Sequence, residues 1–298
     1  MSVAWVFPGQ GSQKLGMADS VASIQGASER FQLASEVLGR NLLAICQGTS
    51  EESDGLNDLN DTRNTQPAMF VIQSILVDDL KRQGRKPSLL AGHSLGEFSA
   101  LYASEVIDFE TTLRLLKCRS ELMADAGGGA MTAVMGFDSQ QLFQVVASTE
   151  GVVVANDNSN DQVVLSGTPD SVKSVVEKIE PKRAVPLKVS GAFHSPFMAN
   201  AAKSFANELQ KVSFKDAIFS VSSNVDPSPS KDGALLKKRL ENQMITGVRW
   251  RETMQVIQNQ GVLTFVEIGP GKVLSGLAKR SLNGMVINQI SSDSDLGH

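Results

Sequence analysis

The sequence predicts an α/β fold in which helices cover both faces of a parallel sheet and a small mixed unit is inserted. Apolar runs typical of buried strands alternate with helical segments on either side of the insertion. Residues 128–196 change to short strands and two amphipathic helices in the order β-α-β-β-α-β, a ferredoxin-like arrangement. The glycines at 127–129 separate the two patterns. We therefore expect a large domain from residues 1–127 and 197–298 and a small subdomain from 128–196.

The elements expected before the insertion follow from periodicity and from helix-ending residues. The longest helix has Thr65 as a candidate N-cap and Gly84 as a candidate stop. The apolar run at 87–94 indicates a strand that leads directly into a helix. In chain order we expect a strand at 2–7, a helix at 65–84, a strand at 87–94, and helices at 95–104 and 108–126.

The insertion and the segment after it show the same two kinds of pattern. Inside the insertion we expect strands at 130–136, 151–157, 162–167 and 183–190, with helices at 139–148 and 169–180. Beyond it we expect strands at 217–224 and 262–269, with helices at 196–212, 234–244 and 251–259 and after residue 272.

Composition limits the functional classes. With 41% hydrophobic and 20% charged residues the chain is typical of a soluble globular protein, and a net charge of −4 argues against nucleic acid as a partner. Cys46 and Cys118 have no metal-ligand spacing, which indicates a reducing compartment, no structural metal and a buried position for both. The apolar stretch 68–77 is too short to span a membrane, and no signal peptide opens the chain. These features predict a cytoplasmic protein.

The stretch "VFPGQGSQ" at residues 6–13 places a glycine-rich loop directly after the first strand. Such loops expose backbone N–H groups that can bind anions. A dinucleotide-binding loop requires G-x-G-x-x-G, but Lys14 occupies the third glycine position, and no Gly-Lys-Ser/Thr follows. The loop is therefore expected to serve an anion other than a bound nucleotide.

The pentapeptide "GHSLG" at residues 92–96 fits G-x-S-x-G between a predicted strand and a predicted helix. In that context the turn is sharp and the serine hydroxyl is exposed at the start of the helix. Ser94 is therefore the predicted nucleophile, in preference to a residue of an ordinary turn.

A serine nucleophile requires a base, and the chain has three histidines. His298 is the last residue and is expected to be disordered. His93 adjoins Ser94, where side chains in a tight turn diverge, so it is expected to line the pocket. His194 falls at the junction of the two units and is the predicted general base. No Asp or Glu stands out as a third member, so a backbone carbonyl or an amide is expected to orient the imidazole.

Arg119 lies three or four residues from each apolar position of its predicted helix, which places it on the inward face. The apolar positions are Leu115, Leu116, Leu122 and Met123, and the polar face carries Arg114, Lys117 and Glu121. A buried guanidinium requires a partner, preferably a carboxylate. That carboxylate belongs either to a substrate or to one of the protein's own acidic residues, and the helix pattern favours neither.

Together these motifs resemble the malonyl-CoA:acyl-carrier-protein transacylases of type II fatty acid synthesis. The matching stretches run in order from end to end: "VFPGQGSQ", "NTQPAMF", "GHSLGEFSAL", "KCRSELM", "GAFHSPFM", "SNVD" and "VEIGPGKVLSGL". The resemblance implies an α/β-hydrolase-like large domain, a ferredoxin-like small one and ping-pong acyl transfer. It implies acyl carrier protein and a coenzyme A thioester as partners, with no cofactor, no metal, no nucleic acid and no membrane; we expect a monomer.

The resemblance also implies roles for individual residues. Ser94 would attack the malonyl thioester, His194 would move the proton, and Arg119 would bind the free malonyl carboxylate. The remaining implied positions are the oxyanion-hole amides of Gln10 and Leu95, the pocket residue Gln66, and a main-chain carbonyl near Gln243 that orients the histidine.

Phe193 departs from the small residue that often precedes the histidine in bacterial fatty-acid enzymes. The "AFH" form resembles malonyl-selective polyketide acyltransferases, so a polyketide pathway is an alternative. The chain could also be a serine esterase or thioesterase, or a catalytically silent carrier-binding module. Because carrier proteins of this pathway are generally acidic, candidate contacts are the basic segments 81–86, 236–239 and 279–280.

Overall fold

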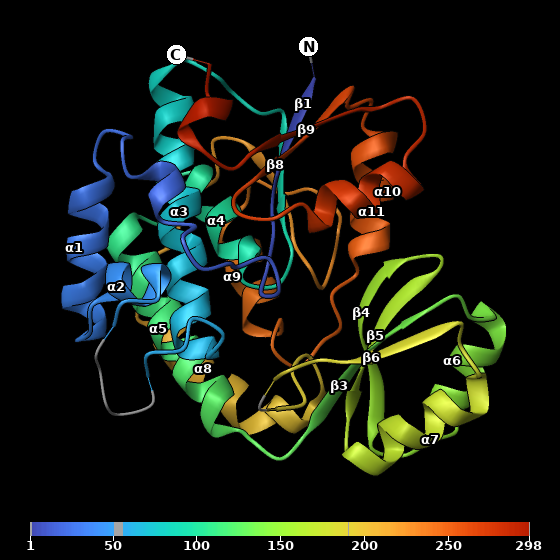
Figure 1. The fold of residues 1–298 in the computed structure, drawn as a ribbon. Coiled ribbons are helices and arrows are strands. Elements are labelled where there is room, and N and C mark those ends of the chain that lie inside the picture. The colour runs from blue at the N-terminus through green and yellow to red at the C-terminus, as the bar shows by residue number, and fades with distance from the viewer. Residues whose placement is uncertain (1, 51–55, 190, 298) are drawn as a thin grey trace.

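The computed structural model describes residues 2–50, 56–189 and 191–297, which form two sheets with surrounding helices (Figure 1). The larger sheet has five parallel strands in the order β7-β2-β1-β8-β9. Its strands are β7 (Ser220–Ser222), β2 (Leu89–Gly92), β1 (Val3–Phe7), β8 (Thr264–Ile268) and β9 (Val286–Ile290). The helices around it are α1 (Ala27–Leu38), α2 (Leu42–Gln47), α3 (Thr62–Arg82), α4 (Gly96–Ala103), α5 (Phe109–Asp125), α8 (Ala199–Gln210), α9 (Gly233–Glu241), α10 (Trp250–Asn259) and α11 (Val273–Ser281).

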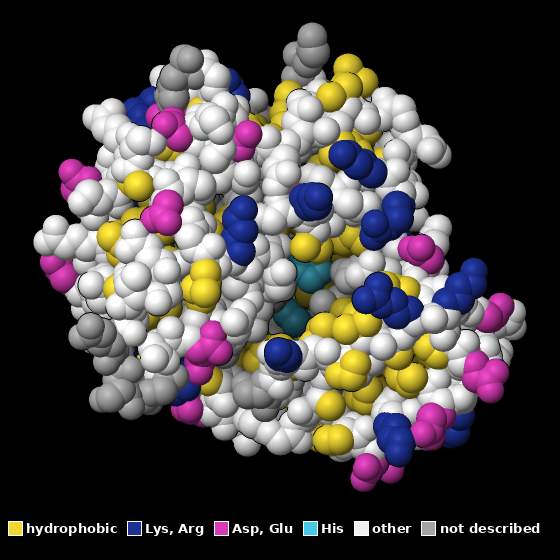
Figure 2. Space-filling model, viewed as in Figure 1, with side chains coloured by type: hydrophobic (Ala, Val, Ile, Leu, Met, Phe, Trp, Pro, Cys, Tyr) yellow, Lys and Arg dark blue, Asp and Glu magenta, His cyan; other side chains and the backbone are white. Residues whose placement is uncertain are grey.

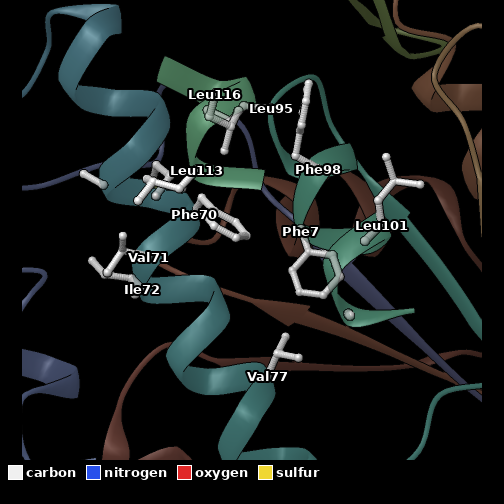
Figure 3. Packing of buried hydrophobic residues seen from close by; sticks show 14 of the residues in the cluster. Phe7, Phe70, Val71, Ile72, Val77, Leu95, Phe98, Leu101, Leu113 and Leu116 are labelled. Carbon is white, nitrogen blue, oxygen red and sulfur yellow. The ribbon is translucent and has the colours of Figure 1, made fainter. Parts of the chain in front are cut away.

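Strand β1 shows why both faces of this sheet are covered. Successive side chains point to opposite faces of a strand, and all four from Ala4 to Phe7 are buried. Trp5 and Phe7 join the core that includes α1, α3, α4 and α5, whereas Ala4 and Val6 join a second core under α10 and α11. Figure 3 shows labelled side chains from β1, α3, α4 and α5 gathered in the first cluster. The predicted parallel sheet with helices on both faces is confirmed.

The smaller sheet is antiparallel and has its own core. Its element order is β3 (Ala130–Met135), α6 (Ser139–Ala147), β4 (Val152–Ser159), β5 (Gln162–Gly167), α7 (Pro169–Ile179) and β6 (Arg183–Pro186). The strand order is β4-β5-β3-β6. This is the predicted β-α-β-β-α-β order, and Figure 1 shows the unit set to one side of the larger sheet.

Strand β4 joins the small sheet to the large unit. Two register shifts, after Val154 and after Asp157, mark bulges that interrupt its pairing with β5. Between them the chain pairs with the segment before α10, where Val248 N donates to Ala155 O at 2.8 Å and Asp157 N donates to Val248 O at 2.9 Å. The Asp157 carboxylate also binds the Arg251 guanidinium at 2.7 Å. The edge of the small sheet is therefore fixed against the large unit.

The prediction that Thr65 caps the third helix is wrong. Helix α3 begins at Thr62, and the Asp61 carboxylate caps it by accepting from Arg63 N at 2.9 Å. Pro67 lies inside the helix and has no N–H for the Arg63 carbonyl. Arg40 supplies the missing donor at 2.7 Å, so the helix continues through the proline. Gly84 follows the helix end with φ +72°, in agreement with its predicted role.

Other differences concern element ends and three elements that the sequence analysis did not predict. Helices α1 and α2 and strand β9 were not predicted. The strand predicted at 217–224 pairs only over Ser220–Ser222, and the one predicted at 183–190 ends at Pro186. Ser190 in that prediction and His298 lie outside the described residues.

Neither cysteine is in a disulfide: Cys46 is buried and Cys118 is half-buried. Burial raises the pKa of the Cys46 thiol to about 12, which keeps it protonated and unreactive. Within the described ranges, no helix has the length and apolar character needed to cross a bilayer. The same ranges hold no cluster of three or more His, Cys, Asp or Glu side chains suited to a metal ion.

Candidate active site

Ser94 occupies the sharp turn between β2 and α4. Its φ of +54° lies in the left-handed region, which is strained for a residue with a side chain. Asn224, which follows β7, holds this turn from the neighbouring strand end. Its Oδ1 accepts from Ser94 N at 2.7 Å, and its Nδ2 donates to Gly92 O at 2.6 Å. Gln243 Nε2 also donates to Ser94 O, at 3.0 Å, so two side chains fix the turn. The role of Asn224, within the stretch "SNVD", was not predicted from the sequence.

The two glycines of G-x-S-x-G are required by close backbone contacts. A Cβ on Gly92 would lie 1.9 Å from the Gly96 carbonyl carbon, and a Cβ on Gly96 would lie 2.1 Å from the Phe7 carbonyl oxygen. Neither contact can be relieved by moving a side chain, because both involve backbone. The glycines therefore allow the helix start to approach β1 and leave the Ser94 hydroxyl exposed to the site.

Ser94 and His194 form a hydrogen-bonded pair although they are 100 residues apart. The Ser94 Oγ to His194 Nε2 distance is 2.7 Å, and His194 Nδ1 lies 3.0 Å from the main-chain oxygen of Gln243. A carbonyl can only accept, so Nδ1 carries the proton and Nε2 is free to accept the serine proton. His194 also has a left-handed φ, of +55°. The histidine is thus oriented by a backbone carbonyl instead of a carboxylate.

The imidazole of His194 is 4% exposed, and its surroundings disfavour the charged form. Burial, reinforced by the charge of Arg119, lowers the pKa of His194 to about 3. Hydrogen bonds to backbone groups oppose this shift without cancelling it. His194 is therefore neutral at physiological pH, which is the state required of a general base.

Arg119 is 1% exposed and has no carboxylate partner within ion-pairing distance among the described residues. Its guanidinium donates to Gln66 Oε1 at 2.6 Å, to Gln243 Oε1 at 2.9 Å and to Ser94 Oγ at 3.2 Å. Its Nε is buried and donates to none of the described residues. Burial lowers the pKa of Arg119 to about 10, so it remains charged. A buried cation without a bound anion strongly favours an anionic ligand.

Glu97 is the buried carboxylate nearest to this centre in the hydrogen-bond network, and the sequence motifs did not single it out. It is 1% exposed, and its Oε2 accepts from Gln243 Nε2 at 2.8 Å and from Asn224 N at 3.1 Å. Burial raises the pKa of Glu97, and these hydrogen bonds oppose the rise. An acidic residue among apolar neighbours in "GEFSALYA" was the available signal. Gln243 thus lies between Glu97 and Arg119, with its amide oxygen toward the cation.

The opening loop lies over the same turn. Among the described residues, the backbone N–H groups of Gln10 and Leu95 donate no hydrogen bond. The Gln10 side chain accepts from Thr62 Oγ1 at 2.9 Å, and Thr62 Oγ1 accepts from Gln66 Nε2 at 2.8 Å. Through Gln66 this chain of hydrogen bonds reaches Arg119. The loop and the guanidinium are therefore positioned by one network.

A cavity of about 80 Å³ brings the predicted residues together. Figure 2 shows a hollow in which histidine side chains are visible, with Lys and Arg side chains around its rim. Of the nine predicted site residues, all except Gln243 line the cavity, and Gln243 contacts Arg119 and His194 instead. Lining residues that were not predicted from the sequence are Met123, Met131, Asn156, Leu187 and Val189.

His93 faces away from the proton path. Its Nε2 donates to Asn158 Oδ1 at 2.9 Å, and its ring packs against Trp250 with centroids 5.6 Å apart. Burial lowers the pKa of His93, so the ring is neutral. His93 therefore lines the cavity while its ring nitrogen anchors β4 to the catalytic turn.

Known proteins are similar to this chain in sequence and in fold over nearly its whole length. The family described as "Acyl transferase domain" matches residues 4–292. The chain is 50% identical to a malonyl CoA-acyl carrier protein transacylase of Synechocystis, over 99% of both chains. A crystal structure of a Synechocystis malonyl-CoA:ACP transacylase superposes with a TM-score of 0.94 at 49% identity, covering 99% of each chain. A malonyl-transacylase in complex with a type II polyketide acyl carrier protein superposes with a TM-score of 0.93 at 37% identity, covering 99% of this chain and 98% of the other.

Proposed function

The chain belongs to the acyl transferase family, among the malonyl CoA-acyl carrier protein transacylases, and we propose that it carries out their reaction by the site described above. It transfers the malonyl group from malonyl-CoA to the phosphopantetheine thiol of acyl carrier protein and so supplies extender units for fatty acid synthesis. The observation that carries the proposal is a buried arginine, beside a serine–histidine pair, that forms no ion pair with any of the described residues. Malonyl thioesters provide both the carboxylate and the electrophile.

In the first half-reaction Ser94 Oγ attacks the thioester carbonyl while His194 Nε2 takes its proton. A bond forms between Oγ and the carbonyl carbon, and the carbon–sulfur bond breaks as the tetrahedral intermediate collapses. The proton on His194 passes to the departing coenzyme A sulfur. The 2.7 Å contact and the neutral imidazole fit this step.

In the second half-reaction the thiol of the carrier's phosphopantetheine arm occupies the position of the departed sulfur. His194 takes the thiol proton, a sulfur–carbon bond forms, the Ser94 ester bond breaks, and Ser94 recovers the proton. In both steps the oxyanion is held by the backbone N–H groups of Gln10 and Leu95, which have no other acceptor among the described residues. Such donors typically lower a barrier by ~3 kcal/mol each.

The Arg119→Ala variant is expected to lose roughly tenfold to a hundredfold in kcat/KM with malonyl-CoA and far less with acetyl-CoA. A charge-assisted hydrogen bond to a carboxylate contributes about 1.5 to 3 kcal/mol, and acetyl-CoA has no carboxylate to lose. Steady-state kinetics with both thioesters measure the difference. Arg114→Ala is the matched control, because Arg114 lies on the exposed face of the same helix and pairs with Glu110. An equal loss on both thioesters, with a lower Tm, would instead assign Arg119 a structural role.

A second candidate is supply of malonyl groups to a polyketide pathway. Phe193 lines the cavity, and one structural relative is complexed with a polyketide carrier protein. The same chemistry serves both pathways, and the carrier protein decides between them. An esterase or thioesterase fits less well, because the histidine is held by a carbonyl and the buried arginine would have no function.

The basic side chains of α11 support an acidic carrier as partner. Lys272, Lys279 and Arg280 are exposed, and with Gln162 they line a groove of about 500 Å³. The other two basic segments are partly held by ion pairs within the fold: Lys81 pairs with Glu105, Arg82 with Asp79, and Arg239 with Asp226. In segment 279–280, Arg280 donates to the uncharged Gln162 side chain at 3.3 Å. Segment 279–280 is therefore the preferred contact of the three.

The remaining expectations are part of the same proposal. The large domain is α/β-hydrolase-like, from residues 1–127 and 197–298, and the inserted subdomain at 128–196 is ferredoxin-like. The reaction uses no cofactor, since Ser94, His194, Arg119 and the backbone N–H groups of Gln10 and Leu95 supply every group that the two half-reactions use. We expect the enzyme to be a cytoplasmic monomer.

Intact-mass measurement tests the proposed function. Mixing with malonyl-CoA should add one malonyl group, and addition of holo acyl carrier protein should move that group to the carrier. Acetyl-CoA should label the protein much less. Loss of the adduct to water at the same rate with or without carrier would indicate an esterase, and absence of any adduct would overturn the proposal.

A further inference from the structure

Asn156 is a cavity residue that the two half-reactions above do not use. Its side-chain Oδ1 is buried and accepts no hydrogen bond from any of the described residues, yet Asn156 lines the cavity with Ser94 and His194. Burying an amide oxygen without a partner is unfavourable, and native proteins rarely leave one so. An unpaired acceptor at this position therefore indicates a donor that arrives with a ligand.

The backbone of β4 holds Asn156 in place. The register shift after Val154 marks a bulge, and bulges near active sites redirect side chains. Asn156 forms a parallel bridge with Val248, and the backbone groups of both its neighbours, Ala155 and Asp157, are hydrogen-bonded to Val248. The backbone at Asn156 is therefore fixed at the junction between the two units.

Asn158, two residues further along β4, shows the contrast. Its Oδ1 accepts from His93 Nε2, so its amide has a structural role within the protein. Asn156 lies on the same strand, at the same junction and next to the same cavity, but its oxygen has no such partner among the described residues. Of the two β4 asparagines at this junction, Asn156 is therefore the one whose amide oxygen has no partner among the described residues.

Substrate chemistry limits what the donor can be. Resting on the proposed function, the ligand is a malonyl thioester of a pantetheine arm. The malonyl carboxylate and the thioester carbonyl have no N–H or O–H group at neutral pH, whereas the arm carries two secondary amides and, beyond both of them, a hydroxyl group. Coenzyme A and the carrier protein present the same arm, so one acceptor can serve both half-reactions.

We propose that Asn156 is a binding residue for the pantetheine arm, with its Oδ1 accepting a hydrogen bond from an arm amide N–H. The contact positions the thioester, and later the incoming thiol, relative to Ser94. It acts at a distance from the malonyl group and therefore supports the arm without discriminating between acyl groups.

Three malonyl thioesters test this inference, namely those of pantetheine, N-acetylcysteamine and ethanethiol, which carry two, one and no amides. The rate of Ser94 acylation is measured by intact mass for the wild type and for Asn156→Ala. Loss of one hydrogen bond should lower kcat/KM by roughly threefold to tenfold with an amide-bearing thioester and leave the ethanethiol thioester unchanged. A loss confined to the pantetheine thioester also supports the proposal and places the contact beyond the first amide, at the second amide or the hydroxyl next to it.

Asn160→Ala is the matched control, because Asn160 is exposed in the turn between β4 and β5 and should leave all three rates unchanged. If Asn156→Ala does not fold, Asn156→Leu keeps the volume and removes the acceptor. An equal loss on all three thioesters, or no loss on any, overturns the inference. Failure of the wild type to react with any of them overturns the proposed function instead.

Discussion

The Ser94→Ala variant is expected to form no covalent adduct with malonyl-CoA and to transfer no malonyl group to acyl carrier protein. Its hydroxyl is the one that contacts both His194 Nε2 and Arg119, at 2.7 and 3.2 Å. Removing a serine nucleophile costs on the order of 10⁶ in rate where the group acts as a unit with its base. Intact-mass measurement after mixing with malonyl-CoA provides the readout.

Ser148→Ala provides the control for this experiment. Ser148 is an exposed residue at the end of α6, and its hydroxyl donates to the Val145 carbonyl. This variant should be labelled as fast as the wild type. An adduct retained by Ser94→Ala would mean that another residue is the nucleophile, and peptide mapping would identify it.

The His194→Ala variant is expected to slow both half-reactions by about 10² to 10⁴, the usual contribution of a general base. One imidazole takes the proton from Ser94 in acylation and from the thiol in transfer, so neither step should be spared. Single-turnover acylation by malonyl-CoA and discharge to holo carrier protein measure the two steps separately. A comparable loss in both steps for His93→Ala, with His194→Ala near the wild type, would show that the other histidine is the base.

The depressed pKa of His194 adds a pH signature to this prediction. Because the folded-state value is about 3, the base stays neutral as pH falls, and kcat/KM should not decline between about pH 7 and 5 through this group. In the unfolded chain a histidine titrates near 6.5. Between about pH 6.5 and 3 the unfolded state therefore binds more protons, so the stability present above pH 6.5 is lost as pH falls toward 3. The decrease in Tm between about pH 6.5 and pH 3 should be smaller for His194→Ala than for the wild type.

Much of the fold could be predicted from the sequence because its signals are local. Buried runs such as Val3–Phe7 and the helical period of Phe109–Asp125 depend on neighbouring residues. The start of α3 could not be predicted in this way, because its continuation through Pro67 depends on Arg40, which donates to the Arg63 carbonyl. The neighbouring residues alone favoured Thr65 as the N-cap. The contact between Arg40 and the Arg63 carbonyl allows the helix to begin earlier, at Thr62.

The residues of the site also differ in whether the neighbouring sequence could predict them. Ser94 stood out because its motif is contiguous, and His194 because the chain has few histidines. Asn224 and Asn156 were not predicted as site residues, and the local signal for Glu97 was an acidic residue among apolar neighbours. Their contacts join segments more than 100 residues apart or depend on a bulge, as in the bonds from Ser94 N to Asn224 and from Gln243 to the Glu97 carboxylate. Such contacts exist only after distant segments of the chain have folded together.

The left-handed backbone at both Ser94 and His194 sets stability against activity in this protein. Each non-glycine residue in that region costs roughly 1 to 2 kcal/mol, and glycine would relieve the cost. Selection for heat resistance alone would therefore replace the two residues that react. A thermostable form of this enzyme has to gain its extra stability elsewhere, in the two cores or at the junction of the sheets, and keep these two positions under strain.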